Sequence, residues 1–329
     1  MIKPLLVLLL STLMSLTAHA ADLAVKALSP ERLPVNGALA TLGLSKDWKS
    51  PQPNTRRALI IIHGRLRNAQ TYLRSAERAS YRSGLRSSTL LIAPQFLDQK
   101  DITKHQLKDN ILRWHKDDWM GGEAALGPVP VSSFTVIDEI LTKLSDRKLF
   151  PNLREVIIAG HSGGAQVVQR YVEVGKGGAD LEKAGITLRY VIANPSSYAY
   201  FDDKRPETVD PKTCPTFDTW KYGMNKLPAY AGKLTAEQIE KNYVSRDVTY
   251  LLGQLDTDPK HPALDTTCAA EAQGAYRLIR GHNFFNYLQQ RHPEGLKHQL
   301  VEVPSVGHDG DLMFTSPEGQ AAVFKPFAN

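Results

Sequence analysis

The chain has 329 residues, is 42% hydrophobic and 22% charged, and carries a formal net charge of +6. The hydrophobic content is ample for a buried core, and we find no internal repeat or low-complexity tract. The basic residues are spread through the chain without a nucleic-acid-binding motif, so we expect no nucleic-acid partner. The densest basic series has helical spacing and predicts a solvated helix face (Arg65, Arg67, Arg74, Arg78, Arg82 and Arg86).

Residues 1–20 have the pattern of an export signal. Lys3 supplies the positive charge, an apolar run follows, and Ala18-His19-Ala20 is a small-x-small cleavage site. The apolar run is interrupted by serine and threonine, and it is short and polar for a membrane-spanning helix. We therefore expect cleavage after Ala20, export to a periplasm or out of the cell, and no integral membrane association.

Residues 21–329 suit a single large α/β domain. The first part, residues 21–55, reads as irregular chain that can include an edge strand. Apolar runs then predict strands at 58–62, 89–93, 156–159, 188–193, 248–252 and 298–303. Amphipathic segments predict helices at 68–82, 132–145, 165–174, 269–290 and 317–324. Pro94 is expected to end the second of these strands. Strands that alternate with helices indicate a parallel sheet with right-handed crossovers.

Two long excursions, residues 100–131 and 195–235, do not fit this repeating unit. Long ordered loops usually serve a function. Their aromatic residues, among them Trp119, Tyr198 and Tyr200, could form a surface that binds an acyl chain or a polymer. The alternative is that they pack as cover over the core.

The most informative stretch is residues 155–171, which read EVIIAGHSGGAQVVQRY. A β-branched run leads into Gly160-His161-Ser162-Gly163-Gly164, and a helix-compatible segment follows at once. This is G-x-S-x-G between a strand and a helix, where a serine is forced onto a sharp turn with its hydroxyl exposed. The alternative is a glycine-rich turn with an incidental serine.

A serine hydroxyl needs a base to become a nucleophile, and the base needs an acid to orient it. The chain order expected for this turn is serine, then aspartate or glutamate, then histidine. Asp256, just past the strand at 248–252, is the best-placed acid, because open-sheet active sites gather at the carboxyl ends of strands. Asp258, which precedes a proline, and the more distant Asp265 are the alternatives.

The expected base is His308, which follows the strand at 298–303 and lies after a glycine. His282 lies within a helix-like run and His298 at the start of a strand, so neither is well placed. His161 is inside the turn and is expected to point into the fold. None of the histidines has H-x-x-x-H spacing with an acidic neighbour, so no zinc site is indicated.

An anion that forms on the substrate during attack needs two backbone N–H donors. One should come from Gly163, the residue after the serine. The other should come from the loop after the strand at 58–62, where Gly64 lets the backbone bend. Arg65 is the expected second donor and Leu66 the alternative, unless this loop is a plain turn at the end of the strand.

Four segments together resemble the α/β-hydrolase superfamily of serine esterases, lipases and depolymerases. They are Ile61-Ile62-His63-Gly64, Gly160-His161-Ser162-Gly163-Gly164, Gly253-Gln254-Leu255-Asp256 and Gly307-His308, and the resemblance covers residues 55–329. It implies an α/β fold with a mostly parallel eight-stranded sheet and helices on both faces. It also implies a Ser162, Asp256 and His308 triad that works through an acyl-enzyme without a cofactor. The first loop reads H-G-R and departs from the H-G-G-G of one esterase branch.

The resemblance leads to a hypothesis of an exported serine hydrolase that cleaves small-molecule or polymeric carboxylic esters. An exported peptidase or amidase of the same fold is the second hypothesis, because the fold alone does not fix the reaction. A non-catalytic binding protein on this scaffold is the third, and the three filled triad positions disfavour it.

The two cysteines, Cys214 and Cys268, both lie in the part of the chain that is expected to be exported. In an oxidising compartment, the simple expectation is that they form one disulfide. The alternative is two separate buried thiols.

Overall fold

The computed structural model describes residues 23–325, so the expected export signal and its cleavage site lie outside the described residues. Eight strands form one sheet in the order β1-β2-β4-β3-β5-β6-β7-β8. Their bounds are β1 Glu31–Val35, β2 Ala38–Leu44, β3 Arg57–Ile62, β4 Thr89–Gln95, β5 Glu155–His161, β6 Thr187–Ala193, β7 Asp247–Gly253 and β8 Gln299–Val303.

The sheet is mostly parallel, as the sequence predicts. Strands β4, β3, β5, β6, β7 and β8 pair in parallel, while β1 and β2 form an antiparallel hairpin at the β4 edge. The stretch expected to be irregular thus contains the edge strand β1 and its neighbour β2. Pro94 does not end β4 but lies within it, opposite Leu42 of β2. Because the pairing of β4 with β3 stops at Ile92, the proline removes no hydrogen bond from the parallel ladder.

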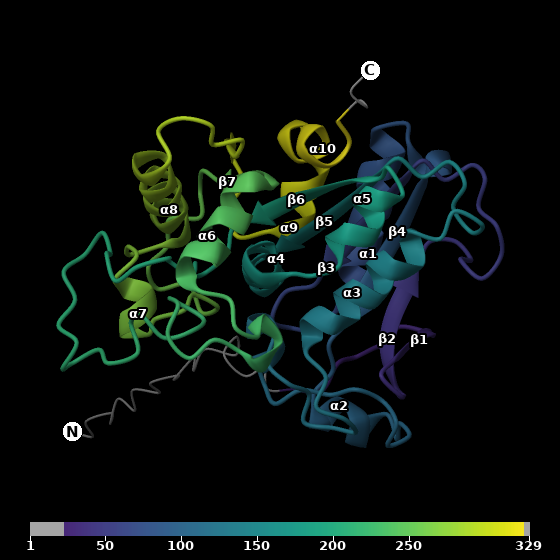
Figure 1. Cartoon of the computed structure of the whole chain (residues 1–329), viewed down its shortest axis with the longest axis horizontal. Coiled ribbons are helices and arrows are strands. Elements are labelled where there is room, and N and C mark those ends of the chain that lie inside the picture. The colour runs from purple at the N-terminus through teal and green to yellow at the C-terminus, as the bar shows by residue number, and fades with distance from the viewer. Residues whose placement is uncertain (1–22, 326–329) are drawn as a thin grey trace, which may run out of the picture.

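Helices cover both faces of the sheet (Figure 1). They are α1 Ala69–Arg82, α2 Gln99–Lys104, α3 Ser133–Leu144, α4 Gly163–Val174, α5 Gly178–Lys183, α6 Ala236–Ser245, α7 Cys268–Glu271, α8 Arg277–Arg291, α9 Gly310–Thr315 and α10 Pro317–Val323. Helices α1, α9 and α10 share one apolar cluster with the sheet, and α3, α4, α6 and α8 share the larger cluster on the other face.

The single helix predicted over residues 269–290 is two helices, α7 and α8. The chain between them passes through Gly274, whose φ of +133° is a conformation that L side chains rarely adopt. This break places Arg277 at the start of α8, where its side chain is buried.

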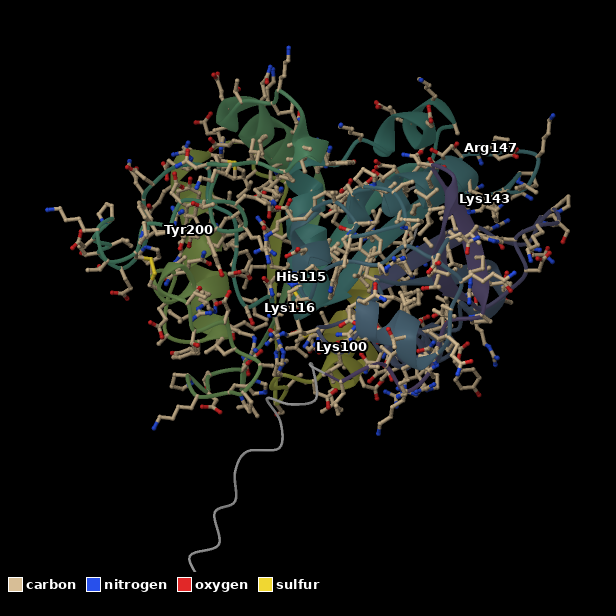
Figure 2. All side chains as sticks on the ribbon, turned by 90° about the horizontal axis from the view of Figure 1, so that it is seen from below. Lys100, His115, Lys116, Lys143, Arg147 and Tyr200 are labelled. Atoms are coloured by element: carbon tan, nitrogen blue, oxygen red, sulfur yellow. A yellow bond between two sulfur atoms is a disulfide. The ribbon has the colours of Figure 1, made fainter. Side chains whose placement is uncertain are left out.

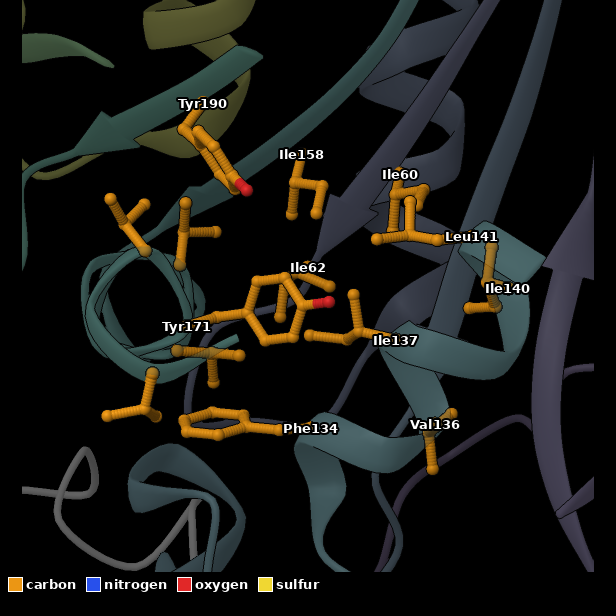
Figure 3. Packing of buried hydrophobic residues seen from close by; sticks show 14 of the residues in the cluster. Ile60, Ile62, Phe134, Val136, Ile137, Ile140, Leu141, Ile158, Tyr171 and Tyr190 are labelled. Carbon is orange, nitrogen blue, oxygen red and sulfur yellow. The ribbon is translucent and has the colours of Figure 1, made fainter. Parts of the chain in front are cut away.

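The larger apolar cluster holds β5 and α4 against their neighbours (Figure 3). Ile62 and Ile158 project from the sheet toward the rings of Phe134 on α3 and Tyr171 on α4, whose centroids are 5.6 Å apart. Full burial of one such side chain stabilises the fold by roughly 2 kcal/mol. The turn between β5 and α4 is therefore anchored on both sides by packed elements.

At the opposite end of the sheet, Glu155 begins β5 and accepts from two arginines on the neighbouring strands. The distances to Arg57 of β3 and Arg189 of β6 are both 2.6 Å, and all three side chains are buried. Arg189 also donates to the carbonyl of Ala322 at 2.9 Å, and Arg57 to that of Lys325. This cluster ties the segment around α10 to the amino ends of the central strands.

The three aromatic residues singled out in the two excursions pack over the core. Trp119 and Tyr198 are completely buried and Tyr200 is 1% exposed, so they do not form an open binding surface. Figure 2 labels Tyr200 among the side chains of its loop. Arg67 is also not on a solvated face: it is buried and paired with Asp101 at 2.8 Å.

Cys214 and Cys268 form a disulfide, with 5.8 Å between their Cα atoms, which confirms the predicted pairing (Figure 2). The bond joins the second excursion to α7. None of the described helices is long and apolar enough to cross a membrane.

Candidate active site

The candidate nucleophile lies on a sharp turn between β5 and α4. Ser162 has a φ of +58° and a ψ of −121°, a strained conformation for a residue with a side chain. A Cβ on Gly160 would lie 2.3 Å from the backbone of Gly164, and one on Gly164 would lie 2.3 Å from the carbonyl oxygen of Ile62. Only glycine fits these two positions, and the tight turn lifts the serine hydroxyl above the end of the sheet.

The structure brings Ser162, His308 and Asp256 together. The Ser162 Oγ lies 2.9 Å from His308 Nε2, and His308 Nδ1 lies 2.7 Å from Asp256 Oδ2. Because a carboxylate can only accept, the imidazole N–H is on Nδ1, and Nε2 is free to accept the serine proton. The three residues come from the ends of β5, β7 and β8, all at the carboxyl edge of the parallel sheet.

The other candidate acids and bases have other partners. Asp258 accepts from the amide of Lys260 in a turn, and Asp265 accepts from the hydroxyl of Tyr222. His282 pairs with Glu302 at 2.9 Å. His298 is buried, and its Nδ1 lies 3.2 Å from the hydroxyl of Tyr250.

A buried arginine completes the surroundings of Asp256. Arg277 Nη1 lies 3.2 Å from Asp256 Oδ1, the carboxylate oxygen that does not contact His308, and Arg277 Nε donates to Ser196 at 2.9 Å. Each carboxylate oxygen thus has its own donor, which fixes the plane of the carboxylate. Sequence reasoning missed Arg277 because the residue lies in a stretch predicted to be continuous helix, 21 positions after Asp256.

The surroundings favour a charged Asp256 carboxylate and a neutral His308 imidazole. Burial alone would raise the pKa of Asp256, but the hydrogen bond from His308 and the charges of His308 and Arg277 lower it below its usual value. Burial lowers the pKa of His308, the hydrogen bond to Asp256 opposes this, and the charge of Arg277 adds to the lowering. An imidazole that is neutral can act as a general base.

The expected donors for a developing anion lie next to each other. Gly163 is the first residue of α4, so its N–H has no acceptor within the helix. A Cβ on Gly163 would lie 3.2 Å from the amide nitrogen of Arg65. The loop that carries Arg65 is held by His63, whose Nε2 accepts from the amide of Phe96 at 2.9 Å. Burial lowers the pKa of His63 to about 4, so the ring stays neutral in this role.

One further side chain, Asn194, joins the loops that carry Asp256 and His308. Asn194 Oδ1 accepts from the amide of Gly253 at 2.8 Å, and its Nδ2 donates to the carbonyl of Gly307 at 3.2 Å. It therefore joins the end of β7, before Asp256, to the residue that precedes His308. From the sequence, Asn194 signalled only the end of a strand.

Two more histidines surround His308. The ring of His161 lies 4.6 Å from that of His308, and its Nδ1 lies 3.2 Å from the hydroxyl of Tyr72. His161 is buried, as expected from the sequence, but it also lines the cleft above the sheet. The ring of His261 lies 5.0 Å from His308 and reaches the same cleft.

The cleft has two lobes that meet at Ser162. The first, which we term the histidine lobe, has a volume of about 590 Å³ and is lined by Tyr72, His161, His261 and His308 among others. The second, the lysine lobe, has a volume of about 330 Å³ and is lined by Arg65, Asp117, Met120, Gly163, Gln166, Lys221, Tyr222, Asp265 and Thr267 among others. No group of three or more histidine, cysteine or acidic residues within 23–325 is arranged to hold a metal ion.

No sequence family and no curated protein matches the chain at a significant level. Solved structures do match. One is a poly(3-hydroxybutyrate) depolymerase from Bordetella parapertussis, which is 20% identical, with a TM-score of 0.57; the match covers 84% of this chain and 81% of that one. Another is poly(aspartic acid) hydrolase-1 from Sphingomonas sp. KT-1, which is 21% identical, with a TM-score of 0.60 and coverage of 91% and 100%.

These likenesses and the sheet order agree on the architecture. The chain has the α/β-hydrolase fold, with a mostly parallel eight-stranded sheet and helices on both faces, as the resemblance in sequence implies.

Proposed function

We propose that the protein is an exported serine hydrolase that cleaves carboxylic esters through an acyl-enzyme on Ser162. One observation carries the proposal: an unbroken chain of hydrogen bonds runs from Asp256 through His308 to Ser162, with distances of 2.7 and 2.9 Å. Such a chain is what an alcohol needs to become a nucleophile at neutral pH.

In the proposed reaction, His308 Nε2 takes the proton of Ser162 as the serine oxygen attacks the substrate carbonyl. The amides of Gly163 and Arg65 donate to the oxygen that becomes negative. His308 then gives its proton to the leaving alcohol, and the acyl group stays on Ser162. In the second half, His308 takes a proton from water as the water oxygen attacks the acyl carbonyl. The bond from the acyl carbon to the Ser162 oxygen then breaks, His308 returns the proton to that oxygen, and the carboxylic acid leaves.

The disulfide between Cys214 and Cys268 supports the proposed export, because disulfides persist in oxidising compartments. The two matched structures support a hydrolase: one is a poly(3-hydroxybutyrate) depolymerase and the other a poly(aspartic acid) hydrolase. An amidase of the same fold is the second candidate, favoured by the likeness to the latter. Matched ester and amide substrates with one acyl group distinguish the two.

Replacement of the proposed nucleophile tests the proposal. The wild-type protein should be labelled by a fluorophosphonate probe and should hydrolyse a chromogenic short-chain ester. Ser162→Ala should abolish the labelling and lower turnover at least about a thousandfold, because Ser162 supplies the only hydroxyl that contacts His308 among the described residues. Ser87→Ala, at an exposed position, is the control and should behave as wild type. Undiminished turnover in Ser162→Ala would falsify the proposal.

A further inference from the structure

The two lobes of the cleft receive different halves of a substrate, and this step rests on the proposed function. Ser162 lines both lobes, so the reacting carbonyl lies at their junction. The leaving alcohol must take a proton from His308 Nε2, and His308 lines only the histidine lobe. The leaving group therefore extends into the histidine lobe. The acyl group extends the other way, past Gly163 into the lysine lobe.

The carboxylates that line the lysine lobe already have partners. Asp117 pairs with Arg65 at 2.8 Å. Asp265 accepts from the hydroxyl of Tyr222 at 2.8 Å and from the amide and hydroxyl of Thr267 at 3.0 and 2.8 Å. Asp117 is thus paired with a cation, and Asp265 keeps its charge while its oxygens are engaged by the wall of the lobe.

The lobe also holds the cation of Lys221. Among the described residues, the ammonium group of Lys221 has no hydrogen bond and no ion pair within 4.0 Å, although it lines the lobe beside Ser162. Burial and the nearby charge of Arg170 lower the pKa of Lys221, and Asp117, Asp118 and Asp265 oppose the lowering. A half-buried cation that is destabilised in this way gains strongly from an anion that enters the lobe.

The position of Lys221 is built into the fold. Its carbonyl oxygen accepts from the buried guanidinium of Arg170 at 2.8 and 3.1 Å. Its side chain lies over Gly121, where a Cβ would come within 3.1 Å of the lysine Cγ. Gly121 in turn accepts from the indole of Trp220 at 2.7 Å. A side chain held at both its backbone and its stem loses less entropy when it binds a ligand.

We propose that the lysine lobe binds an acyl group that carries its own carboxylate, and that Lys221 recognises this carboxylate. The preferred substrates are thus half-esters of dicarboxylic acids, or chains in which each acyl unit bears a free acid. The ester to be cleaved lies at Ser162, the acyl carboxylate meets Lys221, and an uncharged alcohol occupies the histidine lobe.

Four fluorogenic esters test both the charge and the direction. In the first pair, 4-methylumbelliferone is esterified with adipic acid, whose far carboxyl is either free or capped as a methyl ester. In the second pair, the butyrate ester of 7-hydroxycoumarin-3-carboxylic acid carries its carboxylate on the leaving group, either free or as the methyl ester. Steady-state rates are measured for wild type, Lys221→Met, Lys221→Arg and Lys233→Met. Lys233 is an exposed lysine outside both lobes and serves as the control.

Lys221→Met should lower kcat/KM for the free adipate ester by about tenfold, the value of one charge-assisted hydrogen bond. The loss should appear mainly in KM, because the carboxylate is bound equally in ground and transition states. The other three esters should change by less than about twofold, Lys221→Arg should retain most of the preference, and Lys233→Met should match wild type.

An equal fall for all four esters would assign Lys221 a structural role and overturn the proposal, as would no fall at all. A fall confined to the coumarin carboxylate would reverse the two lobes and also overturn it. A wild-type protein that neither reacts with fluorophosphonate nor cleaves the neutral esters refutes the proposed function itself. The two failures are therefore distinguishable.

Discussion

Arg277 places a permanent positive charge beside the acid of the proposed triad. Its side chain has no exposed surface, and Asp256 is 3% exposed, so solvent screens their interaction little. The cation both orients the carboxylate and makes protonation of His308 less favourable. The imidazole of His308 therefore stays neutral at lower pH than that of an ordinary histidine.

This arrangement predicts a shift in the pH profile of Arg277→Met. The proposed reaction requires neutral His308, so kcat/KM should rise with pH through the pKa of that residue. The groups that face the ring are Asp256, Arg277, Asp309, His161 and His261. Loss of the cation should raise the pKa of His308, so the acidic limb of kcat/KM should move to higher pH.

Arg280→Met is the matched control for this measurement. Arg280 is equally buried on the same helix, but it donates to the carbonyls of Gly274, Ser196 and Asp265 and does not touch Asp256. Its loss should lower stability without moving the acidic limb. An equal displacement in both variants would show that the profile responds to a loosened fold and not to the charge at Asp256.

At the scale of single residues, the sequence predicted those whose position follows from a strand end. Ser162 directly follows β5, Asp256 and His308 lie in the loops that follow β7 and β8, and the parallel sheet brings such positions to one edge. The contacts of Arg277 and Asn194 were not predicted, because their partners are distant in sequence. No local pattern separates a buried arginine that faces a carboxylate from one on a solvated helix, and Arg67 shows the same error.

At the scale of elements, the turn between β5 and α4 depends on the absence of a side chain at Gly164. A Cβ there would lie 2.3 and 2.6 Å from the carbonyl oxygens of Ile62 and His63. Both atoms belong to the backbone of a central strand and its exit, so neither can move cheaply. Gly164→Ala should lower the free energy of unfolding by about 3 kcal/mol, measured by urea denaturation.

Gly178→Ala provides the comparison, because it adds the same methyl group to the start of another helix. The new Cβ would meet only a methyl carbon of Leu188 at 3.5 Å, an ordinary contact. Its stability should equal or slightly exceed that of wild type. If both alanine variants had the same unfolding midpoint as wild type, the close approach at Gly164 would carry no energetic weight.

The buried strands were predictable as elements because continuous apolar runs covered on both faces have few alternatives. The edge hairpin of β1 and β2 was not, because its alternating burial is weaker and includes Pro34. The break between α7 and α8 was missed because Gly274 is only one position in a helix-compatible stretch. Short helices such as α5 and α9 owe their existence to packing, which a local pattern does not contain.

At the scale of the whole molecule, the disulfide closes a long loop of the chain. It spans 54 positions and joins the excursion before α6 to α7, across β7. In the chain-entropy treatment, a loop of that size contributes about 4 kcal/mol to stability by restricting the unfolded chain. Reduction of the wild-type protein, or the double change Cys214→Ser with Cys268→Ser, should lower the urea midpoint accordingly.

The double variant controls for other effects of the reductant, because its urea midpoint should be the same with and without reductant. Fluorophosphonate labelling at low urea should persist in both reduced forms, because Ser162, Asp256 and His308 are positioned by the ends of β5, β7 and β8, and neither cysteine lines the cleft. A midpoint that is identical before and after reduction of wild type contradicts the assigned contribution.

The cluster around Glu155 has a consequence for the order in which the molecule is completed on the ribosome. Arg57 and Arg189 reach carbonyl groups made 268 and 133 residues later. When β3, β5 and β6 first emerge, the nascent polypeptide has not yet acquired the oxygen atoms that solvate these guanidinium groups in the finished protein. The central strands therefore reach their final hydrogen bonding only after the segment around α10 has joined the fold.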